Sequence, residues 1–122
     1  LISMRDFSML MMGDAESKAE KCIIQDVKKS GGGLDPSGIN VLKTGHHGSR
    51  SASSEEFIKL VKPETALISC GIDNSYGHPH KETLQRFTDA GTKVYRTDEC
   101  GEIMVRVWNG SYETEVFKER KK

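Results

Sequence analysis

Four histidines are confined to two short, glycine-containing segments of this 122-residue sequence. His46 and His47 lie in KTGHHGS (43–49), and His78 and His80 lie in SYGHPH (75–80). A single histidine is most simply a surface or core residue, but four in two loops indicate shared chemistry. Neutral imidazole is a ligand for Zn²⁺ and Mn²⁺, and an imidazole that titrates near pH 7 can act as a general acid or base.

Alternating strand and helix patterns predict the scaffold that positions these loops. We expect strands over 7–12, 39–43, 65–70 and 93–96, and helices over 15–29, from the serine cap at 53–56 to Pro63, and over 80–90. The first strand is apolar on both faces and should be buried, and the inner face of the first helix should carry Ala15, Ala19, Cys22, Ile23 and Val27. A hairpin of 101–108 and 111–117 should turn at Asn109-Gly110, a favoured type I′ pair. This order predicts an α/β fold: a mainly parallel sheet with helical crossovers, and a closing β-hairpin that adds antiparallel pairing at one side.

In this scaffold the candidate residues follow three successive strands. Asp14 follows the first strand, His46 and His47 the second, and His78 and His80 the third. Parallel strands lie ~5 Å apart and end at one edge, and the carboxyl edge of an open α/β sheet is where ligands bind. A carboxylate beside neutral imidazoles is a ligand set for Zn²⁺ or Mn²⁺.

Simpler interpretations exist for each feature. Asp14 could cap the first helix, His46-His47 could form a surface turn, and His80 could lie in the first turn of the third helix. The glycine run 31–33 follows a helix and lacks a Gly-Lys-Ser/Thr ending, which favours a linker over a phosphate loop. The three cysteines fit neither a zinc ribbon nor a secreted disulfide framework, and we expect them to be small buried thiols.

Composition restricts the function classes. The formal net charge is zero, which argues against nucleic-acid binding through bulk positive charge. The longest apolar run is Met9–Met12, too short to span a bilayer. The length suits one domain, which we assign to residues 1–118, with 119–122 as a charged tail. The compartment stays open, and a membrane-associated or extracytoplasmic parent protein is one alternative.

Four motifs in order carry a resemblance to a known family: GDAE (13–16), VLKTGHHGS (41–49), YGHPH (76–80) and VYRTD (94–98). Together they resemble a metallo-β-lactamase-fold hydrolase, in particular the ComEC-type domain of bacterial competence DNA-uptake proteins, over about residues 7–108. The resemblance implies that Asp14 bridges two metal ions and that one histidine of the His46-His47 pair, which we take to be His46, binds the second ion while the other lines the site. It further implies that His78 and His80 lie beside the metals or against a substrate phosphate, and that Ser49 places a phosphate or fixes its loop.

One part of the family pattern is missing from the chain. The H-x-H-x-D-H motif, which holds most of the first metal's ligands, does not occur in these 122 residues. The resemblance therefore implies the C-terminal half of an αββα sandwich, inactive alone and completed by an N-terminal half. Self-association of the uncovered sheet face into a homodimer is a second expectation, unless the closing hairpin or a helix covers that face.

In the intact parent, the sequence predicts two-metal hydrolysis of a phosphodiester, with Zn²⁺ as cofactor (two ions) and Mn²⁺ as the alternative. Protonated His78 or His80 is expected to neutralise a substrate oxygen or assist the leaving group, with His47 as a further catalytic candidate. DNA taken up during competence is the expected substrate. Alternatives are a small phosphodiester such as a phosphorylcholine ester, a non-catalytic α/β interaction module, and a response-regulator-like domain, which would leave the four histidines without a role.

Overall fold

Five strands form one mixed sheet in the computed structural model, which describes residues 1–33 and 35–118. The strands are β1 (Ile2–Met4), β2 (Phe7–Met11), β3 (Val41–Lys43), β4 (Thr65–Ile68) and β5 (Lys93–Arg96), in the spatial order β1-β2-β3-β4-β5. The pairs from β2 to β5 are parallel, and β1 runs antiparallel to β2. The predicted α/β class with a mixed sheet is therefore confirmed.

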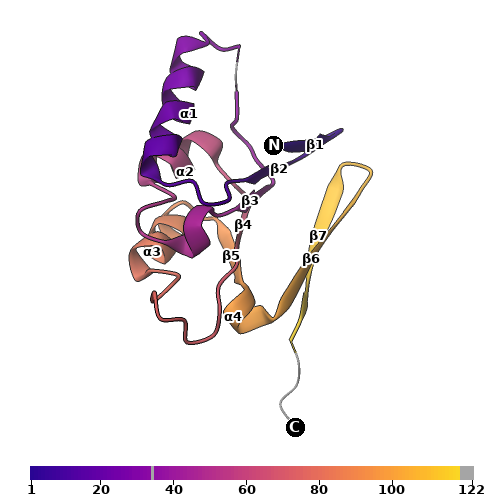
Figure 1. The fold of residues 1–122 in the computed structure, drawn as a ribbon. Coiled ribbons are helices and arrows are strands. Elements are labelled where there is room, and N and C mark those ends of the chain that lie inside the picture. The colour runs from indigo at the N-terminus through magenta and orange to yellow at the C-terminus, as the bar shows by residue number, and fades with distance from the viewer. Residues whose placement is uncertain (34, 119–122) are drawn as a thin grey trace.

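Helical crossovers connect the parallel strands and cover one face of the sheet. They are α1 (Ser17–Lys29), α2 (Glu55–Val61) and α3 (Lys81–Asp89), and all three lie on the same side of the sheet in Figure 1. Strand residues that are paired across neighbouring strands, Leu10, Leu42, Ala66 and Val94, form one apolar row facing these helices. With Phe57 and Phe87, both fully buried, this row makes the core.

The C-terminal hairpin forms at the predicted turn but does not extend the main sheet. Strands β6 (Glu102–Trp108) and β7 (Ser111–Phe117) form a separate two-stranded sheet, so the prediction of pairing at one side of the main sheet is wrong. Asn109 and Gly110 have φ values of 45° and 78°, as a type I′ turn requires. Figure 1 shows the hairpin on the side of the sheet opposite the helices.

Tyr112 joins this hairpin to the sheet. Its ring lies 5.5 Å from that of Phe7, and its hydroxyl is 3.0 Å from the hydroxyl of Thr65, at the amino ends of β2 and β4. Farther along the same face, Met11 is 55% exposed. The prediction that 7–12 is buried on both faces is therefore wrong at its carboxyl end, because the hairpin covers the amino ends of the strands.

The buried face of α1 differs from the one expected. Ala19 and Cys22, predicted to point inward, are exposed, while Glu20 and Ile24 are buried. Glu20 is buried because its carboxylate accepts the backbone N–H groups of Ser53 (2.5 Å) and Ser54 (2.9 Å) before α2. The N-cap of α2 is Ser54 rather than Ser53, and its hydroxyl accepts the N–H of Phe57.

Several smaller features complete the comparison with the sequence. The short strand β1 and the four-residue helix α4 (Thr97–Cys100) were not predicted. Cys70 and Cys100 are half-buried and Cys22 is exposed, so the expected burial of all three thiols is wrong. The predicted tail at 119–122 lies outside the described residues. In the part of the chain that the structure describes, no helix is long and apolar enough to cross a membrane.

Candidate functional site

Three loops meet at the carboxyl edge of the parallel strands. They follow β2 (residues 12–16), β3 (44–54) and β4 (69–80), and the second contains the 3₁₀ helix η1 (Gly45–Gly48). The backbone N–H of His46 donates to the carbonyl of Gly13 at 2.8 Å, and that of His80 donates to the carbonyl of Gly48 at 3.1 Å. The loop that carries His46 and His47 is therefore bonded directly to both of its neighbours.

Two glycines allow this close approach. A Cβ atom on Gly45 would overlap the carbonyl oxygen of Ala15 in the first loop, and one on Gly48 would lie 2.7 Å from the Cβ of Pro79 in the third. Gly48 also has a φ of +79°, which side chains other than glycine rarely adopt. The glycines on either side of the histidine pair are thus needed where the outer loops touch the central one.

The structure brings all four histidines together, with His78 in contact with the other three. The ring centroid of His78 lies 4.9 Å from that of His80, 5.7 Å from that of His46 and 6.2 Å from that of His47. Partial burial, and then the positive charges that His80, His46 and His47 would carry, lower the pKa of His78 below its ordinary 6.5. His78 is therefore neutral at pH 7, with ring nitrogens able to accept a proton or a hydrogen bond.

His46 and His47 are held in a defined orientation. Both have positive φ values, 46° and 54°, which are uncommon outside glycine. Nδ1 of His46 is 2.5 Å from a carboxylate oxygen of Glu16, and Nδ1 of His47 donates to the carbonyl of Ser69 at 2.8 Å. Among the described residues neither Nε2 has a hydrogen bond. Metal-binding histidines are typically held in this way, through the nitrogen that does not face the ion.

His80 has a different environment, because backbone groups occupy both of its ring nitrogens. The N–H of Arg50 donates to Nδ1 at 2.9 Å, so Nε2 carries the proton and donates to the carbonyl of Tyr76 at 3.2 Å. In this conformation His80 ties the second loop to the third and has no free nitrogen for a ligand. It also occupies the N-cap position of α3.

Asp14 is exposed and lies in the first of the three loops. It follows Gly13, whose carbonyl bonds to His46, and its negative charge partly offsets the burial that lowers the pKa of Lys43. Asp14 is not the cap of α1, because that position belongs to Glu16. Within residues 1–33 and 35–118, no three side chains of His, Cys, Asp or Glu are grouped closely enough to hold a metal ion. The chain thus offers an oriented imidazole, with a carboxylate in the adjoining loop.

Ser49 belongs to the histidine loop and directly follows η1. It is buried, its hydroxyl is 2.8 Å from that of Ser51, and it accepts the N–H of Ser51 at 3.2 Å. Ser51 in turn donates to Glu16, the residue that holds His46. Of the two roles considered for Ser49, this environment favours fixing the loop over contacting a phosphate.

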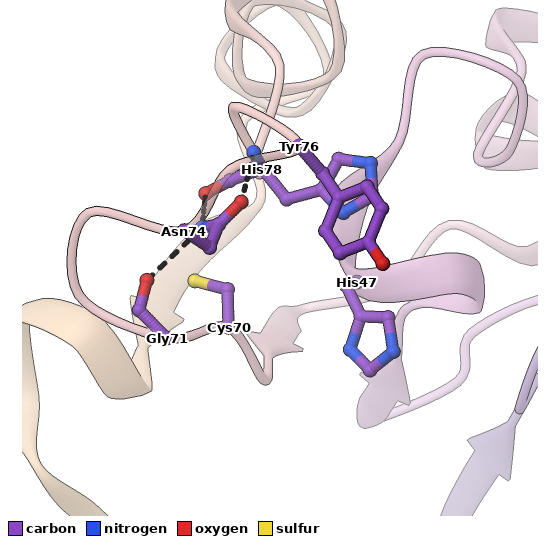
Figure 2. A pocket seen from close by; sticks show the side chains of 6 residues that line it. All are labelled: His47, Cys70, Gly71, Asn74, Tyr76 and His78. Atoms are coloured by element: carbon purple, nitrogen blue, oxygen red, sulfur yellow. Dashed lines mark hydrogen bonds between the residues drawn. The ribbon is translucent and has the colours of Figure 1, made fainter.

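A pocket of about 180 Å³ opens beside the histidines (Figure 2). It is lined by His47, Cys70, Gly71, Asn74, Tyr76 and His78. Burial and the neighbouring Asp98 raise the pKa of the Cys70 thiol, so this side chain is neutral at pH 7. The lining thus contains no lysine, arginine or carboxylate, and the pocket offers aromatic rings, an amide and a neutral thiol.

Sequence reasoning gave no role to three residues that hold the site: Glu16, Glu20 and Asn74. Glu20 precedes Ile23 and Ile24 by three and four positions, so helical spacing alone could have placed it on the inner face of α1. Glu16 follows Asp14 by two residues, but nothing in the spacing indicates that it reaches His46. Asn74 bonds to the third loop at both ends, a common use of asparagine in turns.

Comparison with known proteins gives three matches to curated sequences. The chain is 39% identical over 105 residues to ComE operon protein 3 of Bacillus subtilis, covering 84% of the chain and 12% of that protein. It is 35% identical over 111 residues to competence protein ComA of Neisseria gonorrhoeae (91% and 15%), and 32% identical over 106 residues to recombination protein 2 of Haemophilus influenzae (87% and 12%). The chain thus spans less than a sixth of the length of each relative.

Two further comparisons gave no match. No protein-family model matches the sequence, and no solved structure matches the fold.

Proposed function

We propose, on the premise that the homologues of this chain are bacterial competence proteins, that it forms part of the active site of a metal-dependent phosphodiesterase acting on DNA during uptake. One observation carries the proposal. Three loops at the carboxyl edge of the sheet bring together four imidazoles, with His46 held by Glu16. An interaction module gives no reason to gather four histidines and hold two of them through Nδ1.

The residues fit part of a metal site. His46 presents Nε2, its Nδ1 is held by a carboxylate, and Asp14 lies in the adjoining loop. Imidazole and carboxylate suit Zn²⁺, with Mn²⁺ as the alternative, and two such ions supply an activated water and charge neutralisation for phosphodiester hydrolysis. We propose that the remaining ligands come from an N-terminal half of a metallo-β-lactamase-like sandwich. That segment is the partner this site requires.

The other candidate residues take supporting roles in this proposal. His78 is neutral in the free protein, and a bound phosphodiester would favour its protonated form because an opposite charge raises a histidine pKa. It can therefore neutralise a substrate oxygen once substrate is bound. His47 lines the pocket next to it, while His80 and Ser49 hold the two loops in place.

The test uses the natural gene product that carries these residues, purified with Zn²⁺ or Mn²⁺. Substrates are single- and double-stranded DNA and a small phosphorylcholine ester, which separates the two phosphodiester alternatives. We expect Asp14→Ala and His46→Ala to lower the hydrolysis rate by about 100-fold or more, because each removes a metal ligand. Asp14 is exposed, so its substitution should leave the unfolding midpoint unchanged.

The matched control is Asp26→Ala, which removes an exposed carboxylate from α1 away from the three loops. It should retain full activity. A wild-type protein that hydrolyses none of these substrates with either metal would overturn the hydrolase proposal and favour the non-catalytic interaction module. Activity that survives Asp14→Ala would show that Asp14 does not bind the ions.

A further inference from the structure

We propose that Tyr76 forms a stacking platform for a nucleobase of the substrate, beside the histidine cluster. This inference rests on the proposed function and deepens it, because it names the part of the substrate recognised next to the phosphodiester. Tyr76 is 75% exposed and lies at the pocket beside His78 (Figure 2). Its ring is stacked on that of His78, at a centroid distance of 5.5 Å and an interplanar angle of 18°.

Several hydrogen bonds hold the loop that carries Tyr76. Asn74 donates to the carbonyls of Gly71 (3.0 Å) and His78 (2.6 Å) and accepts the N–H of His78 (2.9 Å). The carbonyl of Tyr76 itself accepts from His80 at 3.2 Å. An isolated exposed tyrosine needs no special explanation. The backbone on either side of Tyr76 is held by hydrogen bonds and its ring is already stacked on an imidazole, so the ring is preorganised to receive a flat base.

The rings on this side of the cluster share an orientation. His47 lies at 18° to His78 with centroids 6.2 Å apart, the same angle that Tyr76 makes with His78. A base stacked on Tyr76 would continue this set of near-parallel rings, while its phosphate could reach the neighbouring imidazoles. Aromatic side chains that stack bases are a general means of holding single-stranded nucleic acid.

The distribution of charge also favours recognition by stacking. The formal net charge is zero and the pocket is lined by no lysine or arginine. Nucleic-acid affinity at this pocket therefore has to come from contacts other than a broad basic surface. Stacking supplies such affinity without charge and tolerates every base sequence, because every base has a flat aromatic face.

The experiment measures binding of single-stranded DNA to the natural gene product in EDTA, so that hydrolysis does not interfere. The probes are a fluorescent thymidine oligonucleotide and an abasic oligonucleotide of the same length, read by anisotropy. We expect Tyr76→Ala to weaken binding of the thymidine oligonucleotide about tenfold, which corresponds to about 1.4 kcal/mol, and to leave binding of the abasic one unchanged. Tyr76→Phe should bind like the wild type.

Salt provides a second readout. Because stacking on a base neutralises no phosphate, Tyr76→Ala should lower the affinity without changing the dependence of log Kd on log salt. Three results would overturn the proposal that Tyr76 stacks on a base: an equal loss of affinity of Tyr76→Ala for both oligonucleotides, no loss for either, or a wild-type protein that binds neither. These outcomes are read without metal, so they are distinguishable from failure of the hydrolase proposal, which is judged by turnover with Zn²⁺ or Mn²⁺.

Discussion

The carboxylate of Glu20 in α1 accepts the backbone N–H of Ser54, the residue that caps α2. In a capping box a glutamate of the same helix accepts this N–H, but here an acid from another helix does so, at 2.9 Å, and also accepts the N–H of Ser53. The side chain of Glu20 is fully buried. The segment between the histidine loop and α2 is thus fixed from α1, so the site depends on a residue outside its own loops.

Removing this carboxylate should destabilise the chain strongly. We expect Glu20→Ala to lower the free energy of unfolding by about 2–4 kcal/mol, because it leaves two N–H groups without an acceptor and opens a cavity. Glu20→Gln should lose less, since its amide oxygen can still accept one of the bonds. Urea unfolding measures both. Glu56→Ala, an exposed acid on α2, is the control and should change stability by less than about 0.5 kcal/mol.

The two glycines beside the histidine pair should tolerate no side chain. Gly45→Ala would collide with the carbonyl of Ala15, and Gly48→Ala would meet Pro79 and adopt a positive φ. Each should cost about 1–3 kcal/mol of stability and shift the resonances of His46 and His47 in NMR spectra. The control is Gly71→Ala, whose new Cβ would make only an ordinary contact, at 3.9 Å from Asn74. A Gly45→Ala variant as stable as Gly71→Ala would show that the loops are less closely packed.

Local signals were sufficient for most of the fold. Strand β5 has the bounds predicted from its sequence, Pro63 follows the end of α2, and Asn109-Gly110 turns the hairpin. These features depend on turn residues and apolar patterning, which short stretches of sequence determine. Strand β1 has three exposed residues and no alternation of burial, so its pairing with β2 is a tertiary event without a local signal.

The candidate site divides in the same way. The meeting of the histidine loops follows from strand order, because the topology fixes which loops share an edge. The ring environments do not follow from it. The carboxylate of Glu16 bonds to His46, and the backbone N–H of Arg50 donates to His80, only because loops distant in sequence pack together. No spacing rule predicts those contacts.

Glu16 should act as a positioning residue for His46. In the natural gene product, Glu16→Gln should lower Zn²⁺ affinity by about 10–100-fold, because the carboxylate that orients the imidazole and raises its basicity is lost. The activity measured at saturating Zn²⁺ should fall less than the affinity, which separates positioning from direct catalysis. Glu55→Gln, an exposed acid on α2, is the matched control. Unchanged Zn²⁺ affinity in Glu16→Gln would contradict this role.

The free energy of unfolding should depend on pH through the carboxylate of Asp98. Arg96 donates two hydrogen bonds to this carboxylate, at 3.0 and 2.7 Å, and thereby lowers the pKa of Asp98 below its ordinary 3.8. A lowered folded-state pKa stabilises the protein above the ordinary value, and this contribution disappears as the pH falls below 3.8. Asp98→Asn should therefore cost about 1–2 kcal/mol near pH 7. The difference from wild type should shrink at about pH 3, where the unfolded carboxyl is protonated.

Urea unfolding at both pH values tests this dependence. Asp26→Asn, on the exposed face of α1, should change stability by less than about 0.5 kcal/mol at either pH. A cost of Asp98→Asn that is equal at the two pH values would mean that the ion pair with Arg96 does not stabilise the fold.

Association through the open sheet face should depend on Tyr112. The sequence predicts self-association unless the hairpin covers that face, and the structure provides a hairpin contact in which Tyr112 packs on Phe7 and bonds to Thr65. We expect Tyr112→Ala to release the hairpin, lower stability by about 2 kcal/mol, and expose the apolar face beneath it. The variant should then bind a hydrophobic dye and sediment as a concentration-dependent dimer, because closed two-fold pairing is the common outcome.

Tyr112→Phe separates packing from hydrogen bonding in this contact. It keeps the ring on Phe7 but loses the hydroxyl bonds, so it should cost only about 1 kcal/mol and sediment like the wild type. If Tyr112→Ala and the wild type sediment identically and bind equal amounts of dye, the hairpin does not control access to the sheet face. A wild-type chain that already dimerises would show that the hairpin leaves too much of the sheet face uncovered. The uncovered part would be the region around the exposed Met11, away from the contact of Tyr112 with Phe7.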